Sequence, residues 1–229
     1  MKLSQLKIDP EFQSKIPPLQ FEEEQQLEQN IIAEGRLLNP IITWNGYILD
    51  GHTRYRIPKK HGFIKFEVEE IQLANKYEAL AWICKNQLGR RNLSPERKKF
   101  LLGKEYESTK LAVGGQPGNC NKVNRCDQND HIDSEKRTCE RIAVEHGVGS
   151  ATVRRAEKYS RGIDAAEEAV PGAQEEILTG HIKATDEQIV ALASIPKEER
   201  PAILEELKKK KSDRDDTCLL YTSDAADEL

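Results

Sequence analysis

The sequence predicts an α+β domain followed by an all-α domain. Two apolar runs flank Asn45-Gly46, and these two residue types accept the positive φ of a two-residue hairpin turn. Apolar residues at helical spacing dominate the second half of the chain. Between the halves, residues 113–135 are rich in Gly, Asn and Asp and almost lack apolar side chains. We therefore expect a flexible linker there, with one domain on each side.

Length and composition agree with two small domains. The chain has 229 residues, of which 37% are hydrophobic, enough for two modest cores. We assign residues 1–112 to the N-terminal domain, 136–211 to the helical domain and 212–229 to a disordered tail. The final CLLYTSDAADEL, from Cys218 to Leu229, resembles a translated sequencing adapter. We expect this last segment to be non-native.

The N-terminal domain is expected to combine a small mixed sheet with helices. The predicted elements are a short strand from Leu3 to about Asp9, a helix over 21–35, a hairpin of 40–44 and 47–50, a helix over 52–61, a strand over 66–73 and a helix over 75–89. Two apolar faces support the outer helices, formed by Phe21, Leu27, Ile31 and Ile32 and by Ala79, Trp82, Ile83 and Leu88. Pro58 removes a backbone donor, so it kinks its helix or marks a start.

The remaining elements are predicted to be helices. Ser94 is a candidate N-cap, with Pro95 at the first helical position of a helix that extends to about Lys110. Beyond the linker, helices are predicted over 137–146, 149–161, 164–179 with a break at Pro171-Gly172, 185–194 and 197–210.

Charge and cysteine content restrict the class of protein. The net charge is −4 with 32% charged residues, so any nucleic-acid surface must be a local basic patch. The chain has no apolar run of membrane-spanning length and no signal peptide, which predicts a cytoplasmic protein without membrane contact. Five cysteines at irregular spacing suit reduced thiols. Possible zinc ligands follow no finger spacing, so we expect no metal on Cys120, Cys126, His131 and Cys139.

TCERIAVEHGVGSATVRRAEKY has the pattern of a DNA-binding helix-turn-helix. Ile142 and Ala143 would face inward, Gly147 would form the turn, and Val148 and Val153 would anchor the second helix. That helix would present polar and basic side chains to a groove of double-stranded DNA, with Arg141 adding charge nearby. The candidate DNA-binding residues are Arg141, Ser150, Ala151, Thr152, Arg154, Arg155 and Lys158. An ordinary helical hairpin with solvated arginines is the alternative.

ILDGHTRYR, residues 48–56, has the pattern of an anion site at a strand-to-helix junction. A glycine lets backbone N–H groups approach an anion, and the helix dipole favours negative charge. We expect phosphate to bind at Gly51, His52, Thr53, Arg54 and Arg56. Asp50 is a candidate Mg²⁺ ligand. A salt-bridged surface corner is the alternative.

A second polar cluster precedes the helix that starts at Ser94. NQLGRRNLSP contains Asn86, Gln87, Arg90 and Arg91 near the end of one helix and the start of the next. If both clusters line one cleft, a nucleoside triphosphate with a divalent cation would balance their charge.

These motifs resemble those of the ParB-like family over residues 1 to about 210. DGHTRYRI is similar to the family's GERRxRA phosphate motif at Gly51, Arg54 and Arg56, and NQLGRRNLSP is similar to ENxxRxxLxP at Arg90, Leu93 and Pro95. The resemblance implies a ParB/sulfiredoxin fold followed by a helix-turn-helix domain. It further implies binding of CTP with Mg²⁺, recognition of a DNA site, a homodimer, and action in partition with a ParA-type ATPase.

Departures from the family motifs modify this expectation. His52 and Thr53 replace the acid and the first arginine of the phosphate motif, and Asn86-Gln87 replaces a Glu-Asn pair. The missing glutamate would hold metal or orient water, so nucleotide hydrolysis stays open and a weak CTPase is the most we expect. The variant motifs resemble ParB-like proteins of phages and mobile elements, in partition or transcriptional regulation, and the nucleotide need not be CTP.

An enzyme of the same fold is the alternative function. A free serine kinase has a similar DGH turn, with Asp50 or a glutamate of residues 22–24 as the base, and nuclease activity has been attached to ParB-like domains. His52 stands where sulfiredoxin has its catalytic cysteine, which argues against that chemistry.

Overall fold

The computed structural model describes residues 3–90, 92–113 and 138–208. These residues form two compact units. Unit 1 comprises Met1–Gly89 and Glu107–Asp130, and unit 2 comprises Arg90–Tyr106 and His131–Leu229. The predicted linker core, the zinc candidates Cys120, Cys126 and His131, and the final adapter-like segment lie outside the described residues. Within the described residues, no helix is long and apolar enough to cross a bilayer.

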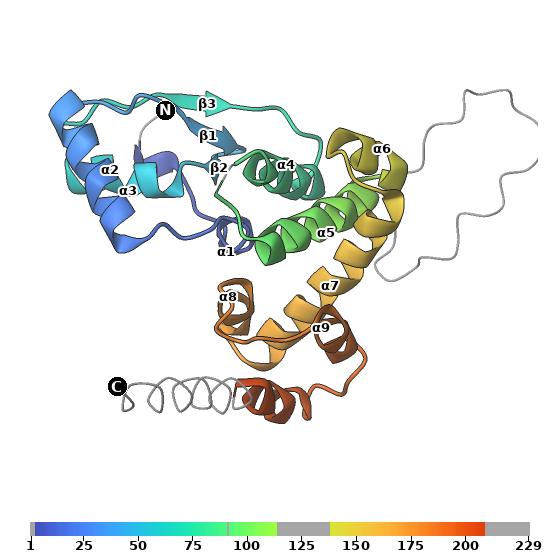
Figure 1. Ribbon diagram of the computed structural model, residues 1–229. Helices are drawn as coiled ribbons and strands as arrows, with labels where there is room; N and C mark the ends of the chain where they lie inside the picture. Colours follow the sequence, from blue (N-terminus) through green and yellow to red (C-terminus); the bar gives the residue numbers. More distant parts are fainter. Residues whose placement is uncertain (1–2, 91, 114–137, 209–229) are drawn as a thin grey trace, which may run out of the picture. The chain divides into compact units, whose positions relative to one another are not determined.

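Unit 1 is built on a mixed three-stranded sheet, which confirms its predicted α+β character (Figure 1). Its elements are η1 (Leu3–Gln5), α1 (Pro10–Gln13), α2 (Phe21–Glu34), β1 (Ile41–Trp44), β2 (Tyr47–Asp50), α3 (His52–Lys60), β3 (Val68–Glu70) and α4 (Lys76–Leu88). The strand order is β2-β1-β3, with β1 antiparallel to β2 and parallel to β3.

The predicted hairpin is confirmed. Asn45 and Gly46 have φ of 49° and 77°, the positive values that a two-residue turn requires. The register shifts between Ile42 and Thr43, because Ile42 pairs with Asp50 while Thr43 pairs with Ile48. This leaves one extra residue on β2 just before Gly51. A bulge at that place bends the strand as it enters the turn to α3.

Helices cover both faces of this sheet, because successive strand residues point to opposite sides. Ile41 and Ile48 pack on one face with side chains of α2 and α3. Leu49 packs on the other face with Phe12 of α1 and with Ala79, Leu80 and Ile83 of α4. The predicted apolar face of α4 is confirmed at Ala79 and Ile83, which are fully buried. On α2, Ile31 is buried while Phe21 and Ile32 are exposed, so only part of its predicted face reaches the core.

The predicted strand over Leu3 to Asp9 is wrong. The chain forms the 3-10 helix η1, a single bridge between Lys7 and Tyr47, and then α1. Asp9 accepts a hydrogen bond from the N–H of Glu11, and Pro10 occupies the first helical position. Asp followed by Pro is a helix start, and it ends the extended segment after one residue pair.

Unit 2 is helical throughout the residues described. It contains α6 (Thr138–Glu145), α7 (Ser150–Ala169), α8 (Ala173–Leu178), α9 (Asp186–Leu192) and helical residues 200–208, together with the first part of α5 (Pro95–Ala112). Ser94 caps α5 as predicted, since its hydroxyl accepts from the N–H of Arg97 at 3.2 Å. The break at Pro171-Gly172 is also present, with Gly172 at φ 91°.

The two helices predicted over 149–161 and 164–179 are instead joined as α7 up to Ala169, so the predicted interruption near Gly162 is wrong. Gly162 lies inside α7, and its lack of a side chain lets α9 pack closely against the helix. A Cβ at Gly162 would lie 2.0 Å from the carbonyl oxygen of Ile189. Glycine here serves close helix packing and does not end the helix.

α5 contributes residues to both units, whereas the sequence analysis assigned residues 1–112 to one domain. Residues Arg90–Tyr106 belong to unit 2. There α5 crosses α7 at Gly103, where a Cβ would lie 2.2 Å from the carbonyl oxygen of Ala156. Ser94 also donates to the carbonyl of Leu178, and Arg97 pairs with Glu175 at 2.5 Å.

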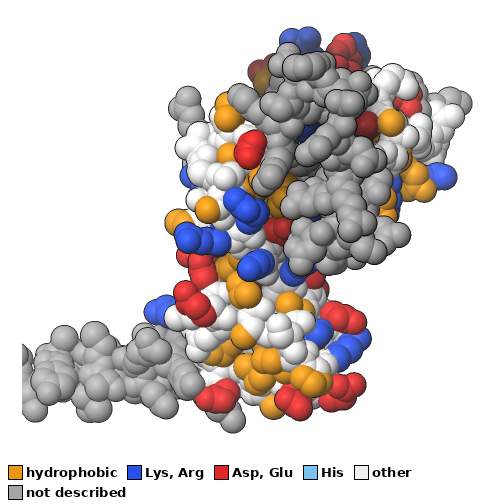
Figure 2. Space-filling model, turned by 90° about the vertical axis from the view of Figure 1, so that its right-hand side faces the viewer, with side chains coloured by type: hydrophobic (Ala, Val, Ile, Leu, Met, Phe, Trp, Pro, Cys, Tyr) orange, Lys and Arg blue, Asp and Glu red, His pale blue; other side chains and the backbone are white. Residues whose placement is uncertain are grey.

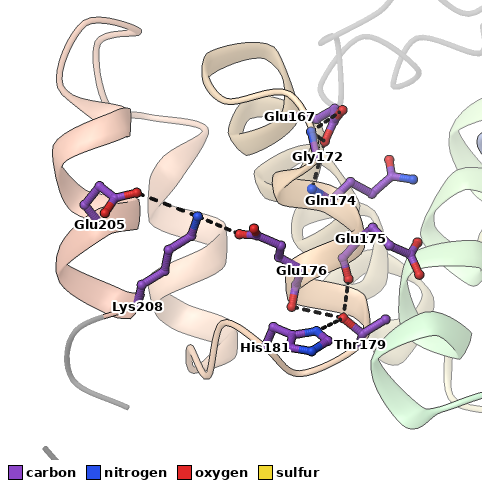
Figure 3. Close-up of polar contacts among 9 residues, drawn as sticks. All are labelled: Glu167, Gly172, Gln174, Glu175, Glu176, Thr179, His181, Glu205 and Lys208. Atoms are coloured by element: carbon purple, nitrogen blue, oxygen red, sulfur yellow. Dashed lines mark hydrogen bonds and ion pairs between the residues drawn. The ribbon is translucent and has the colours of Figure 1, made fainter. Parts of the chain in front are cut away.

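Polar contacts fix α8 in unit 2 (Figure 3). The carboxylate of Glu167 accepts from the N–H groups of Gly172 and Gln174 at 2.8 to 3.1 Å. It therefore satisfies backbone donors at the start of α8, which Gly172 has no side chain to cap. Lys208 reaches back to Glu176 at 2.7 Å and joins the last described helix to α8.

Candidate functional site

The predicted anion turn lies where β2 passes into α3. Gly51 is the N-cap of α3, with φ 97° and ψ 24°, a left-handed conformation that favours glycine. The first N–H groups of any helix have no intrahelical acceptor. At α3 no side chain caps them, because the N-cap residue is a glycine. The backbone at Gly51, His52 and Thr53 thus has the helix-start geometry that the sequence predicted for anion binding.

Arg54 is held by protein groups and does not extend from the turn. One of its terminal nitrogens donates to the carbonyls of Asn39 and Pro40, each at 3.0 Å, and the other donates to Asp50 at 2.7 Å. Its guanidinium also lies against Gly51, where a Cβ would be 3.4 Å from it. Arg54 therefore fastens the loop before β1 to the turn. Binding of phosphate by Arg54 would require it to leave these partners, and that role stays a prediction.

Arg56 is the exposed arginine of the same motif. Its side chain is 53% exposed, against 18% for Arg54. It reaches Glu24 of α2 at 3.3 Å. A pair this long and this solvated is easily exchanged for another anion.

His52 and Gln87 are buried polar side chains without protein partners. His52 is 4% exposed and Gln87 is fully buried, and neither ring nitrogen of His52 nor either amide atom of Gln87 forms a hydrogen bond among the described residues. Leaving such groups unsatisfied costs about 1 to 3 kcal/mol each. Ordered water or a ligand is the usual explanation.

His52 follows β2 and Gln87 lies on the last turn of α4, and these two elements of unit 1 pack in one core cluster. Leu49 of β2 packs in one cluster with Ile83 of α4. Three residues beyond Leu49 stands His52, and one helical turn beyond Ile83 stands Gln87. The turn at Gly51 and the last turn of α4 thus each carry an unsatisfied polar group.

His52 is neutral at physiological pH. Desolvation by burial lowers the pKa of His52 from 6.5 to about 4, Asp50 opposes the shift, and the positive charge of Arg56 adds to it. The ring therefore offers one donor and one acceptor.

A cavity of about 390 Å³ lies beside Arg54, within the size range of small-molecule sites. Leu27, Ile31 and Leu38 make much of its wall apolar, while Asn30 and Asn39 place amide groups beside Arg54. The sequence analysis missed this cavity, because α2 and residues 36–39 meet only through the packing of unit 1.

The second predicted cluster divides between the two units. Asn86 is exposed on the last turn of α4, beside the buried Gln87, and both belong to unit 1. Arg90 begins unit 2, and Arg91 lies outside the described residues. Convergence of Arg90 and Arg91 with the Gly51 turn therefore stays a prediction.

The predicted Mg²⁺ ligand Asp50 is paired with Arg54 and is 14% exposed. Within the described ranges, no group of three or more His, Cys, Asp or Glu side chains is arranged to hold a metal ion. Mg²⁺ is commonly held by one or two protein oxygens together with substrate phosphates. The carboxylate of Asp50 is an oxygen ligand of that kind, and its role in holding Mg²⁺ stays a prediction.

In unit 2, α6 and α7 are joined by a short turn at the predicted place. Gly147 has φ 65°, and the N–H of Val148 donates to the carbonyl of Ala143 at 2.9 Å. Ile142 and Ala143 of α6 and Val153 of α7 are buried as predicted. Val148 is 37% exposed, so its predicted anchoring role is wrong; the backbone hydrogen bond holds the turn instead.

The outer face of α7 carries most of the candidate DNA-binding residues. Exposed positions are Ala151, Thr152, Arg154, Arg155 and Lys158, with Arg141 exposed on α6 and Ser150 partly buried. Arg141, Arg155 and Lys158 form no ion pair with any other residue that the structure describes. Figure 2 shows several Lys and Arg side chains near one another on one face of the molecule, with Asp and Glu side chains beside them.

Comparison with solved structures finds matching chains, one of which is described below. No family model matches the chain, and no curated protein matches it. The chain is similar to the solved structure of a Pnob8-like ParB-N domain. The sequences are 17% identical, the TM-score is 0.48, and the match covers 93% of this chain and 95% of that chain.

Proposed function

We propose that this chain is a ParB-like, sequence-specific DNA-binding protein whose unit 1 binds a nucleoside triphosphate of the CTP type. The observation that carries the DNA-binding half is the exposed basic face of α7 after a glycine turn, on which Arg155 and Lys158 form no ion pair with another described residue. A helix presented in this way can enter the major groove, with arginines reading base edges and lysines contacting phosphates. Partition of a plasmid or mobile element and transcriptional regulation are the two roles that such a protein would serve.

The nucleotide half is supported by the unsatisfied groups around Gly51. A triphosphate would take up the free N–H groups at the start of α3 and the exposed guanidinium of Arg56. Neutral His52 and Gln87 would supply hydrogen bonds to uncharged groups of the nucleotide, and Asp50 is the proposed Mg²⁺ ligand. When bound, Mg²⁺ would neutralise phosphate charge. Nothing among the described residues favours the kinase or nuclease alternative.

Further partners follow from the family resemblance. A homodimer, a ParA-type ATPase and association with the nucleoid are part of the proposal. A gene for such an ATPase beside this one would favour partition over regulation.

Selection from a random duplex pool followed by binding measurements tests the DNA-binding half. Arg155→Ala should weaken binding to the selected duplex by about 1 to 3 kcal/mol if the arginine contacts a base. Lys183→Ala removes the same charge from an exposed residue between α8 and α9 and serves as the control. Equal small losses in both variants, with unchanged site preference, would contradict a reading role for α7.

A further inference from the structure

α2 places carboxylates against the basic residues of α3. Glu24 and Glu28 lie one turn apart on α2, and Arg56 and Lys60 lie one turn apart on α3. Glu24 pairs with Arg56 at 3.3 Å, and Glu28 pairs with Lys60 at 2.7 Å. Without ligand, the accessible positive charge of the phosphate motif is already faced by a carboxylate of the same chain.

The two arginines of the motif differ in how they are held. Arg54 is fixed by two carbonyls and by Asp50, and it is largely buried, so removing it from these partners would expose unsatisfied groups. Arg56 has one long contact, to a carboxylate that is 40% exposed. Only Arg56 can exchange its partner at low cost.

The two glutamates of α2 also differ. Glu28 accepts from Lys60 and contacts His61 at 2.6 Å, and its side chain is 23% exposed. It therefore holds α2 to α3. Glu24 makes the single longer contact, and its loss would leave the Glu28 contacts in place.

We propose that Glu24 is an internal competitor for the anion site, so that a phosphate must displace its carboxylate from Arg56 in order to bind. This inference deepens the proposed nucleotide binding and rests on it. Its physical basis is simple exchange: the guanidinium gives up one carboxylate and gains a phosphate oxygen, while Glu24 returns to water. The ligand's affinity is then reduced by the strength of the pair that it breaks.

The exchange also sets what the site prefers. A phosphate of charge −2 competes for Arg56 better than a carboxylate or a neutral group does. Because only a ligand with a phosphate must displace Glu24 from Arg56, we expect Glu24 to lower the discrimination between a nucleoside triphosphate and the corresponding nucleoside.

Calorimetric titration of the full chain with CTP, ATP and GTP in the presence of Mg²⁺ tests the proposal. Glu24→Gln should bind the nucleotide about two- to five-fold more tightly than the wild type, the range expected for an exposed ion pair. Glu22→Gln is the matched control: Glu22 is exposed on the same helix, the charge change is identical, and it pairs with no other described residue. Glu22→Gln should change the affinity much less.

The same gain must depend on Arg56. In an Arg56→Ala background, Glu24→Gln should give no gain beyond that of Glu22→Gln. Equal gains from Glu24→Gln and Glu22→Gln, or a gain that persists without Arg56, would overturn the competitor role and leave nucleotide binding intact. If neither the wild type nor Glu24→Gln binds any of the three nucleotides, the proposed nucleotide function fails and the competitor role fails with it.

Discussion

His52 is the buried titratable residue through which unit 1 should respond to pH. Its pKa is about 4 in the folded chain, against 6.5 for an ordinary histidine. Above pH 6.5 both states are neutral and stability is full. As the pH falls from 6.5 towards 4, His52 is protonated in the unfolded chain but stays neutral in the folded chain, so the free energy of unfolding decreases. The loss should approach roughly 2 kcal/mol after allowance for partial solvent screening.

Denaturant unfolding of the wild type and His52→Gln at about pH 7.5 and about pH 5 measures this effect. The wild type should lose more stability than the variant between the two conditions. His181→Gln removes an exposed histidine of unit 2 and should keep the wild-type response. An unchanged response in His52→Gln would mean that the folded ring accepts its proton as easily as the unfolded one.

At the scale of residues, the sequence predicted the groups of the anion turn but not their partners. Gly51, His52 and Arg56 stand in the predicted helix start because strand, glycine and helix follow one another locally. The carbonyls that bind Arg54 lie 14 and 15 residues earlier in the chain, and the carboxylate facing Arg56 lies 32 residues earlier. The matched spacing of Glu24 with Glu28 and of Arg56 with Lys60 was the one pattern from which this pairing could have been inferred.

Among the helices, the crossing of α5 and α7 is a contact that is sensitive to side-chain size. A Cβ at Gly103 would lie 2.2 Å from the Ala156 carbonyl oxygen and 2.7 Å from the Ser160 hydroxyl. The backbone oxygen has no rotamer by which to move away, so Gly103→Ala must separate the helices. We expect a loss of about 1 to 3 kcal/mol or more in the free energy of unfolding.

Thermal or urea unfolding checks this loss against Gly62→Ala. That control adds the same methyl group where no atom lies within 4 Å. It should change stability by about 0.5 kcal/mol at most. A Gly103→Ala variant as stable as the control would mean that α5 and α7 can move apart at their crossing without loss of stability.

Element boundaries were predicted well where the determinant was local. The Asn45-Gly46 hairpin, the Ser94 cap and the Pro171-Gly172 break follow from the residues at those positions. Gly162 was misjudged because glycine weakens a helix on its own but permits close packing against a neighbour. The strand predicted before Asp9 failed for the opposite reason, since the local Asp-Pro helix start outweighed the alternation.

On the scale of the whole molecule, the proposed nucleotide and DNA sites fall on different units. The Gly51 turn belongs to unit 1 and α7 to unit 2, while α5 supplies residues to both. The functions of both sites stay predictions, but that the chain carries two such candidate sites was predictable from motifs. The communication between them was not, because it depends on the free-energy difference between bound and unbound states of the entire chain.

If the nucleotide regulates DNA binding, thermodynamic linkage requires that the effect be mutual. If bound nucleotide changes the affinity of the protein for the selected duplex about five-fold, saturating duplex must change the affinity for the nucleotide by the same factor. The check is a pair of titrations, nucleotide with and without duplex and duplex with and without nucleotide, in the presence of Mg²⁺. Under conditions where Arg155→Ala leaves the duplex unbound, adding duplex should leave nucleotide affinity unchanged. If the wild type binds nucleotide equally well with and without duplex, and duplex equally well with and without nucleotide, the two sites act independently. The nucleotide would then have a purpose other than the control of DNA binding.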